Sequence, residues 1–262
     1  MLKNNRDNTA FNLIQFVTAF LIFGGICLAK MKISWVSVGL GAAFGILTLL
    51  VYVLKIKVLA IGQLHITTLI LTSSLIIPSL FGVVFGQTIS VWKVLCILIL
   101  LVFIYFAIPM DEEKKEHTNR KLWLILTAIS FVLTGSLGVM QTVFQSTGYG
   151  EETTVFLAVS FLIASAGTLG MTLKNREEGT CRFTKKHYLF AVLCGVTTFA
   201  MNFINLYLAG VLPTVLFFPM VNGASLIATS VFSVLLFRES LTKRQIIGLI
   251  GGTVSLILIG VI

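Results

Sequence analysis

Charged residues are scarce in this sequence. Only 11% of its 262 residues are Asp, Glu, Lys or Arg, whereas 57% are hydrophobic. A single soluble core cannot absorb so apolar a chain. Stretches of roughly 20 residues contain no charged side chain, and that length matches the hydrocarbon thickness of a bilayer. These absences exclude an ordinary soluble domain and predict that the chain crosses a membrane several times.

The uncharged stretches predict an all-α polytopic membrane protein with about nine transmembrane helices. In chain order, the predicted spans are Phe11–Ala29, Trp35–Leu54, Val58–Phe85, Val91–Ile108, Leu122–Val143, Thr153–Leu173, Tyr188–Gly210, Thr214–Phe237 and Ile246–Ile262. The third span is long and polar enough to tilt or break, and Pro219 can interrupt the eighth.

Motifs for metal, redox and catalytic chemistry are missing from the sequence. The four cysteines, Cys27, Cys96, Cys181 and Cys194, have no CxxC spacing, so we predict no metal site, no disulfide and no cofactor. The spans contain no HExxH motif, no pair of acids and no Walker-type glycine loop. We therefore expect a protein that is not an enzyme and does not use ATP.

The basic residues indicate how the chain is threaded through the membrane. When the connectors are assigned alternately to two sides, sixteen Lys and Arg residues fall on one side and three on the other. We expect the protein to be integral to the cytoplasmic (plasma) membrane. Cytoplasmic loops carry the excess of positive charge, so the N-terminus is predicted to lie in the cytoplasm and Ile262 on the opposite, outer side. The net charge of +9 does not indicate nucleic acid, because no basic stripe is interleaved with aromatic residues.

Three tryptophans mark the edges of predicted spans. Trp35, Trp92 and Trp123 each lie near the start of a span. Because an indole ring prefers the headgroup level of a bilayer, all three are predicted to be membrane anchors.

The sequence repeats itself at an offset of 152 residues. This offset aligns Phe85-Gly86-Gln87-Thr88-Ile89-Ser90 with Phe237-Arg238-Glu239-Ser240-Leu241-Thr242, and it matches spans two to four with spans seven to nine. Span one matches span six at another offset, Ala19-Phe20-Leu21-Ile22 against Ser160-Phe161-Leu162-Ile163. Matched helices are five apart, an odd number, so the two copies would have inverted topology.

The repeat predicts three parts of the chain. Residues 1–108 form a first repeat of four helices, residues 109–121 a charged cytoplasmic linker, and residues 122–262 a second repeat of five helices. The fifth span has no partner in the first copy. We expect this 4 + 5 arrangement to form one membrane-embedded bundle.

Several short patterns recur in the second half: Pro219, Asn222-Gly223, the segment from Phe237 to Thr242, Gln245-Ile246-Ile247-Gly248 and a glycine-rich final helix. With these patterns the chain resembles the drug/metabolite transporter (DMT) superfamily, of the EamA-like family. The resemblance covers nearly the whole chain and implies a ten-helix fold of two inverted repeats, here lacking the first helix. It also implies that both chain ends are cytoplasmic, which the charge count contradicts.

Uncharged polar side chains within the spans are the candidate substrate-binding residues, because polar groups in lipid are costly unless they meet a partner. The candidates are Asn222, Asn202, Asn205, Tyr207, Gln141, Gln63 and His65. Asn202 and Asn205 share a helix face, where hydrogen bonding between helices is the alternative role. His65 is either a proton site or a packing residue. Asn222 is the strongest candidate, although Asn222-Gly223 also suits close helix packing.

These features together predict a secondary transporter that moves a small neutral or zwitterionic metabolite, such as an amino-acid-like solute, by alternating access. None of the acids lies in the middle of a span, so coupling through a central carboxylate is not expected. The predicted partners are the solute and the lipid bilayer, and a homodimer is possible. The alternative is a non-transporting or partner-dependent membrane subunit.

Overall fold

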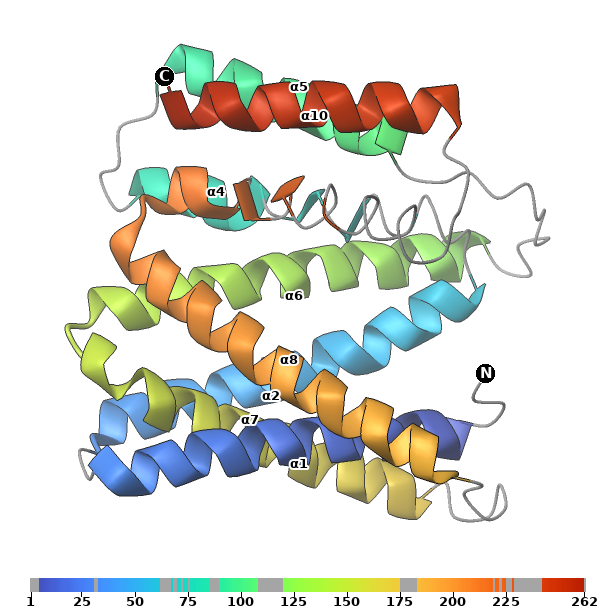
Figure 1. Cartoon of the computed structure of the whole chain (residues 1–262), viewed down its shortest axis with the longest axis vertical. Coiled ribbons are helices and arrows are strands. Elements are labelled where there is room, and N and C mark those ends of the chain that lie inside the picture. Colours follow the sequence, from blue (N-terminus) through green and yellow to red (C-terminus); the bar gives the residue numbers. More distant parts are fainter. Residues whose placement is uncertain are drawn as a thin grey trace. The chain divides into compact units, whose positions relative to one another are not determined.

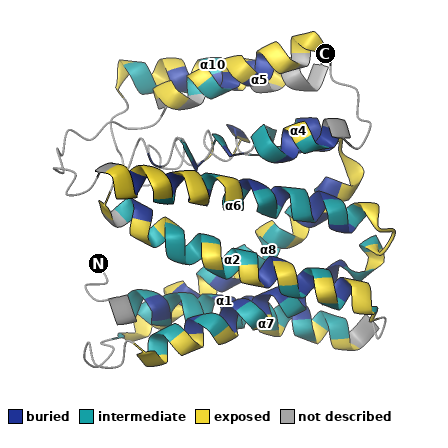
Figure 2. Ribbon diagram, turned by 180° about the vertical axis from the view of Figure 1, so that it is seen from behind, coloured by how far each residue is buried: buried dark blue, intermediate teal, exposed yellow. Residues whose placement is uncertain are grey.

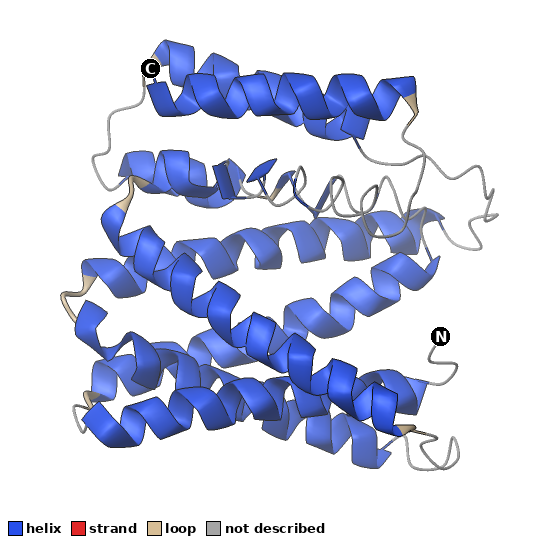
Figure 3. Cartoon of the chain, in the orientation of Figure 1, coloured by secondary structure: helices blue, strands red, loops and turns tan. Residues whose placement is uncertain are grey.

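The structure, a computed structural model, consists of helices joined by turns and loops in its described part, without a strand there (Figure 3). It describes residues 5–30, 33–61, 67, 70–71, 73–74, 76–84, 90–107, 120–174, 183–218, 220–221, 223–224, 228 and 242–261. The helices are α1 (Asn5–Lys30), α2 (Trp35–Ile61), α4 (Ile76–Val84), α5 (Val91–Ala107), α6 (Arg120–Ser146), the 3-10 turn η1 (Gly150–Glu152), α7 (Thr153–Lys174), α8 (Lys185–Val211) and α10 (Lys243–Val261).

Five of these helices are long and apolar enough to cross a membrane. Their spanning segments are Asp7–Leu28, Trp35–Leu59, Lys121–Ser146, Gly150–Lys174 and Lys185–Val211. Large apolar side chains lie on the surface of these and the shorter helices (Figure 2). That distribution fits a surface solvated by lipid, and it confirms the prediction of an all-helical protein with several membrane-span candidates.

The tryptophans do not all take the predicted position. Trp35 and Trp92 are 91% and 67% exposed at the starts of α2 and α5, as an anchor requires. Trp123 is buried, and its Nε1 donates to Thr67 Oγ1 at 3.1 Å. The anchor prediction is therefore wrong for Trp123, because a helix partner satisfies its N–H inside the protein.

The chain forms two compact units that each draw on both halves of the sequence (Figure 1). Unit 1 contains residues 1–52 and 143–211, that is, α1, most of α2, the end of α6, α7 and α8. Unit 2 contains residues 53–142 and 212–262, with the end of α2, α4, α5, most of α6 and α10.

Unit 1 is built around α7, whose spanning segment is 56% buried against 17–28% for the other four. Phe161 of α7 contacts Phe16 and Phe23 of α1, with ring centroids 5.9 and 5.8 Å apart. On α2, a Cβ at Gly41 would lie 2.6 Å from the Phe156 carbonyl oxygen. Only glycine allows the two backbones to approach so closely.

A carboxylate joins two connectors of unit 1. Glu152 Oε2 accepts hydrogen bonds from Ser34 N at 2.9 Å and from Ser34 Oγ at 2.6 Å. Ser34 Oγ also accepts from Ser37 N at 3.1 Å, which caps the start of α2. The negative charge of Glu152 thus stabilises the N-terminus of a helix from another part of the chain.

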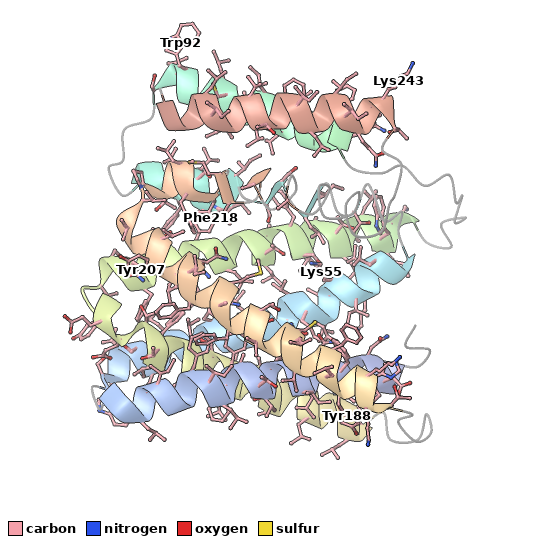
Figure 4. All side chains as sticks on the ribbon, viewed as in Figure 1. Lys55, Trp92, Tyr188, Tyr207, Phe218 and Lys243 are labelled. Atoms are coloured by element: carbon pink, nitrogen blue, oxygen red, sulfur yellow. The ribbon has the colours of Figure 1, made fainter. Side chains whose placement is uncertain are left out.

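In unit 2, α5 and α10 pack side by side and run in opposite directions (Figure 4). Arg244, at the start of α10, donates from Nη2 to the Tyr105 carbonyl near the end of α5 at 2.9 Å. Its guanidinium lies 4.6 Å from the centre of the Tyr105 ring. A Cβ on Gly251 would overlap the Phe103 ring, so the absence of a side chain at Gly251 makes room for that ring.

The third predicted span is not one continuous helix. Ser74 lies in a turn, with its N–H donating to Leu71 O at 3.2 Å and its carbonyl accepting from Ile77 N at 3.0 Å. The helix α4 begins only at Ile76. The expectation that this span tilts or breaks is therefore confirmed at Ser74, while most of the eighth span lies outside the described residues.

Candidate functional site

The two predicted amides of α8, Asn202 and Asn205, lie near a row of hydrogen-bonded polar side chains within unit 1. Asn202 Nδ2 donates to the Thr198 carbonyl of its own helix at 2.9 Å. Thr198 Oγ1 accepts from Gln15 Nε2 of α1 at 2.7 Å. Asn205 is half-buried, and its amide has no hydrogen-bond partner among the residues that the structure describes. Asn205 is therefore the amide of α8 that remains free to hydrogen-bond within the described part of the chain.

Tyr207 and Gln145 show how side chains near that row are used differently. Tyr207, on α8, is 60% exposed (Figure 4). Gln145, from the end of α6, donates from Nε2 to the Leu206 carbonyl at 2.6 Å. A Cβ on Gly210 would lie 2.7 Å from Gln145 Oε1. Gln145 therefore fastens α6 to α8, while Tyr207 faces away from the core.

Gln141 is the most deeply buried of the predicted binding residues that the structure describes. The residue as a whole is 7% exposed, and its amide forms no hydrogen bond within the described part of the chain, although its polar atoms are not fully buried. The adjacent Thr142 is instead bonded, since Oγ1 donates to Gly138 O at 3.2 Å and accepts from Thr214 Oγ1 at 3.5 Å. An amide whose polar atoms stay accessible while the rest of the residue is buried can bind a small molecule, so Gln141 remains a ligand-binding candidate.

A tight contact lies next to Gln141 on α6. A Cβ on Gly138 would lie 2.9 Å from Pro78 Cγ of α4 and 2.9 Å from the Phe218 ring. One turn earlier, a Cβ on Gly135 would lie 2.5 Å from the Ile77 side chain. We call this contact between the two glycines of α6 and the side chains of Ile77, Pro78 and Phe218 the glycine waist. The glycine waist is apolar, and it covers α6 at Gly135 and Gly138, in the second half of the helix.

Three of the predicted site residues, Gln63, His65 and Asn222, lie outside the described residues. Asn202, Asn205 and Tyr207 belong to unit 1, whereas Gln141 belongs to unit 2. Asn202, Asn205 and Tyr207 therefore lie on the same helix, α8, whereas Gln141 lies on α6 beside the glycine waist.

Two buried hydroxyls of α6 were not among the predicted site residues. Thr127 and Ser130 precede Gln141 on α6, and both are buried in unit 2. Together with Trp123, Thr134 and Gln141 they recur every three or four residues, or multiples of that, along one face of the helix. That spacing was the available signal, but single hydroxyls in membrane helices usually bond to their own backbone, so composition alone does not single them out.

The described residues offer hydrogen bonding rather than charge as the chemistry of this site. In the ranges searched, which are those the structure describes, no group of three or more His, Cys, Asp or Glu residues comes together. The polar side chains that face inward are amides and hydroxyls. Such groups recognise uncharged donors and acceptors, or the dipole of a zwitterion, and they hold no proton that titrates near neutral pH.

No protein-family model matches the sequence, and no curated protein matches it.

Proposed function

We propose that this protein is a secondary transporter that moves a small neutral or zwitterionic metabolite across the membrane by alternating access of two inverted repeats. Transporters of this architecture bind solute near the membrane midplane, where corresponding helices of the two repeats meet. The proposal rests mainly on where helices cross, because helices related by a twofold axis must cross at equivalent positions.

The crossing of α5 and α10 supports an inverted repeat. Leu100 and Gly252 are separated by the repeat offset of 152 residues. A Cβ on Gly252 would lie 3.9 Å from Leu100 Cδ1, so the two equivalent positions touch. The antiparallel direction of this pair is the one that inversion requires.

The crossing of α1 and α7 supports the same symmetry independently. Phe161 contacts Phe16 and Phe23, which lie one turn on either side of Phe20. Phe20 is the position that the alignment of spans one and six matches with Phe161. These two helices therefore also meet at equivalent residues.

A third relationship comes from close backbone contacts. Gly41 approaches the Phe156 carbonyl, and a Cβ on Gly195 of α8 would lie 2.8 Å from the Gln15 carbonyl oxygen. Gln15 and Phe156 are equivalent under the alignment of spans one and six, and Gly195 is two residues from the position equivalent to Gly41. The contact of α2 with α7 thus has a counterpart in the contact of α1 with α8.

Symmetry of this kind suits a carrier. If two repeats of opposite orientation adopt slightly different conformations, exchanging those conformations opens the solute site to the other side of the membrane. The nine predicted spans, DMT-like patterns and cytoplasmic N-terminus form the topological part of this proposal. The amides of Gln141 and Asn205 supply neutral hydrogen-bonding groups, which suit a neutral or zwitterionic solute.

The proposal is tested by solute efflux from liposomes. Purified protein is reconstituted into liposomes loaded with pooled amino acids, nucleosides, sugars and small amines, and efflux is quantified by mass spectrometry. We expect efflux of one solute class, absent from protein-free liposomes and reduced at least about tenfold by Gln141→Leu or Asn222→Ala. Efflux equal to that of protein-free liposomes for every solute would instead favour a partner-dependent membrane subunit.

A further inference from the structure

The hydroxyls of Thr127 and Ser130 are buried without a hydrogen bond. The two side chains are 2% and 0% exposed, and within the described structure neither oxygen has a partner. Buried hydroxyls of α7 behave differently. Ser165 Oγ donates to Phe161 O at 2.6 Å, and Thr168 Oγ1 donates to Ala164 O at 2.9 Å. The same local bond to the helix backbone is geometrically open to Thr127 and Ser130, and neither makes it.

An unmade hydrogen bond of this kind leaves the desolvation penalty of the hydroxyl uncompensated. A buried polar group without a partner in a native protein calls for a functional or structural reason. Replacing it with an apolar group of the same shape is neutral or stabilising when the group has no role in the empty protein. Two such groups three residues apart also share one helix face.

The segment that packs along α6 contains a break in a membrane helix. Contacts advance in parallel along the two segments, from Trp123 with Thr67 to Gly138 with Pro78. The turn at Ser74 lies between these two contacts along its segment, as Thr127 and Ser130 lie between them along α6. Irregular backbone at membrane depth occurs where protein or a polar cavity covers it.

The glycine waist separates this pair from Gln141 along the helix. At a rise of 1.5 Å per residue, Ser130 lies about 12 Å before Gly138 and about 17 Å before Gln141. One face of α6 thus carries Thr127 and Ser130 at one level and Gln141 at another, with the apolar contacts of the glycine waist between them. By the charge distribution, the level of Thr127 and Ser130 is the one nearer the cytoplasm.

We propose that Thr127 and Ser130 form a binding site for the uncharged hydrogen-bonding group of the solute, a side-chain hydroxyl or carboxamide. Each hydroxyl offers one donor and accepts as well, which complements such a group. An ionised group would be left uncompensated by the described residues of the neighbouring segment, because those between Thr67 and Pro78, such as Leu71 and Ser74, are uncharged. This inference rests on the proposed transport function and narrows its substrates to amino acids such as serine, threonine, asparagine and glutamine.

Selective uptake tests the substrate class. Uptake of serine is compared with alanine, and uptake of asparagine with leucine, in liposomes containing wild-type protein or the Thr127→Val/Ser130→Ala variant. A site built to bond a hydroxyl rejects the analogue that lacks it strongly, so we expect wild type to prefer serine about 100-fold or more. The variant is expected to lose that preference. Equal serine-to-alanine ratios in both proteins would overturn the proposal.

Thermal unfolding in detergent gives a second test that needs no transport. Without solute, we expect the double variant to unfold at the same temperature as wild type or higher, because it loses only unpaired hydroxyls. Serine added in a series up to about 10 mM should raise the unfolding temperature of wild type and leave that of the variant unchanged, because a ligand that binds only the folded protein stabilises it. Ser136→Ala is the matched control, since Ser136 Oγ donates to Val132 O of its own helix at 2.8 Å, and it should retain the serine response.

The two tests separate the two proposals. If wild type transports none of these solutes but serine stabilises it through Thr127 and Ser130, the binding site stands and the transport function fails. If the variant is destabilised and responds to serine as wild type does, the hydroxyls are structural and the proposal is wrong. If no amino acid of the stated class stabilises wild type or crosses the membrane, the binding site is also refuted.

Discussion

Leu100 of α5 touches Gly252 of α10, 152 residues further along the chain, at the position to which the sequence repeat matches it. The preceding residue, Gly251, lies against the Phe103 ring. Glycine at both positions lets α10 approach α5 closely. The face of α10 that carries these glycines therefore determines how closely the two helices pack. The two glycines also give a matched pair for mutation.

Gly251→Ala is expected to destabilise unit 2, whereas Gly252→Ala is expected to be tolerated. A Cβ on Gly251 would overlap the Phe103 ring, while one on Gly252 would make ordinary contacts at 3.9 Å. Overpacking of this kind costs about 1–3 kcal/mol. Thermal unfolding of the two purified variants in detergent measures the difference.

A second substitution checks the cause of that loss. Phe103→Leu in the Gly251→Ala background should restore part of the stability, because the shorter side chain vacates the space. The two effects are then non-additive, as expected for residues in contact. Strict additivity would show that Gly251 matters for another reason.

Gly41→Ala is expected to lower stability more than Gly39→Ala. At Gly41 the new Cβ would lie 2.6 Å from the Phe156 carbonyl oxygen and 3.2 Å from its Cα, so α2 and α7 would have to separate. At Gly39 it would meet nothing within 4 Å. The unfolding temperatures of the two variants report the difference, and equal values would contradict the close contact of α2 with α7.

Gln145→Leu is expected to loosen the contact of α6 with α8. The substitution keeps most of the side-chain volume but removes the hydrogen bond from Nε2 to the Leu206 carbonyl. Hydrogen bonds between membrane helices contribute about 0.6–2 kcal/mol. Ser146→Ala, at an exposed neighbour that bonds only to Val143 O, is the control and should leave the unfolding temperature nearly unchanged.

The charge distribution predicts the side of the membrane on which the chain ends. With a cytoplasmic N-terminus and nine spans, Ile262 lies outside, whereas DMT-like topology would place it in the cytoplasm. Alkaline phosphatase fused after Ile262 should be active, because the enzyme folds only outside the cytoplasm. A fluorescent green fluorescent protein fusion at the same residue would contradict the charge count.

The sequence predicted the helices well because uncharged length is a direct signal of a membrane span. Predicted span Thr153–Leu173 became α7 at Thr153–Lys174, and predicted span Val91–Ile108 became α5 at Val91–Ala107. The main difference is α2, predicted to end at Leu54, which continues to Ile61. Its last turns carry Lys55 and Lys57, both exposed, and a charge ends an apolar window without ending a helix.

The candidate site was predicted less completely. An amide in a span is visible in the sequence, so Gln141 could be singled out, but its lack of a partner depends on which helix faces it. Trp123 was predicted to lie at the membrane surface because it is near the start of a span. Its hydrogen bond to Thr67 is a contact between distant parts of the chain, which that position does not reveal. The unpaired hydroxyls of Thr127 and Ser130 depend on rotamers that no sequence pattern specifies.

Counterflow in liposomes tests the central claim most directly. Liposomes are loaded with a high concentration of one unlabelled solute, diluted into buffer with a trace of the same labelled solute, and followed over time. A carrier that alternates between two sides exchanges solute, so the account predicts that the label accumulates transiently inside above its external concentration. No accumulation beyond that of protein-free liposomes, for any small neutral or zwitterionic solute, would contradict transport by alternating access.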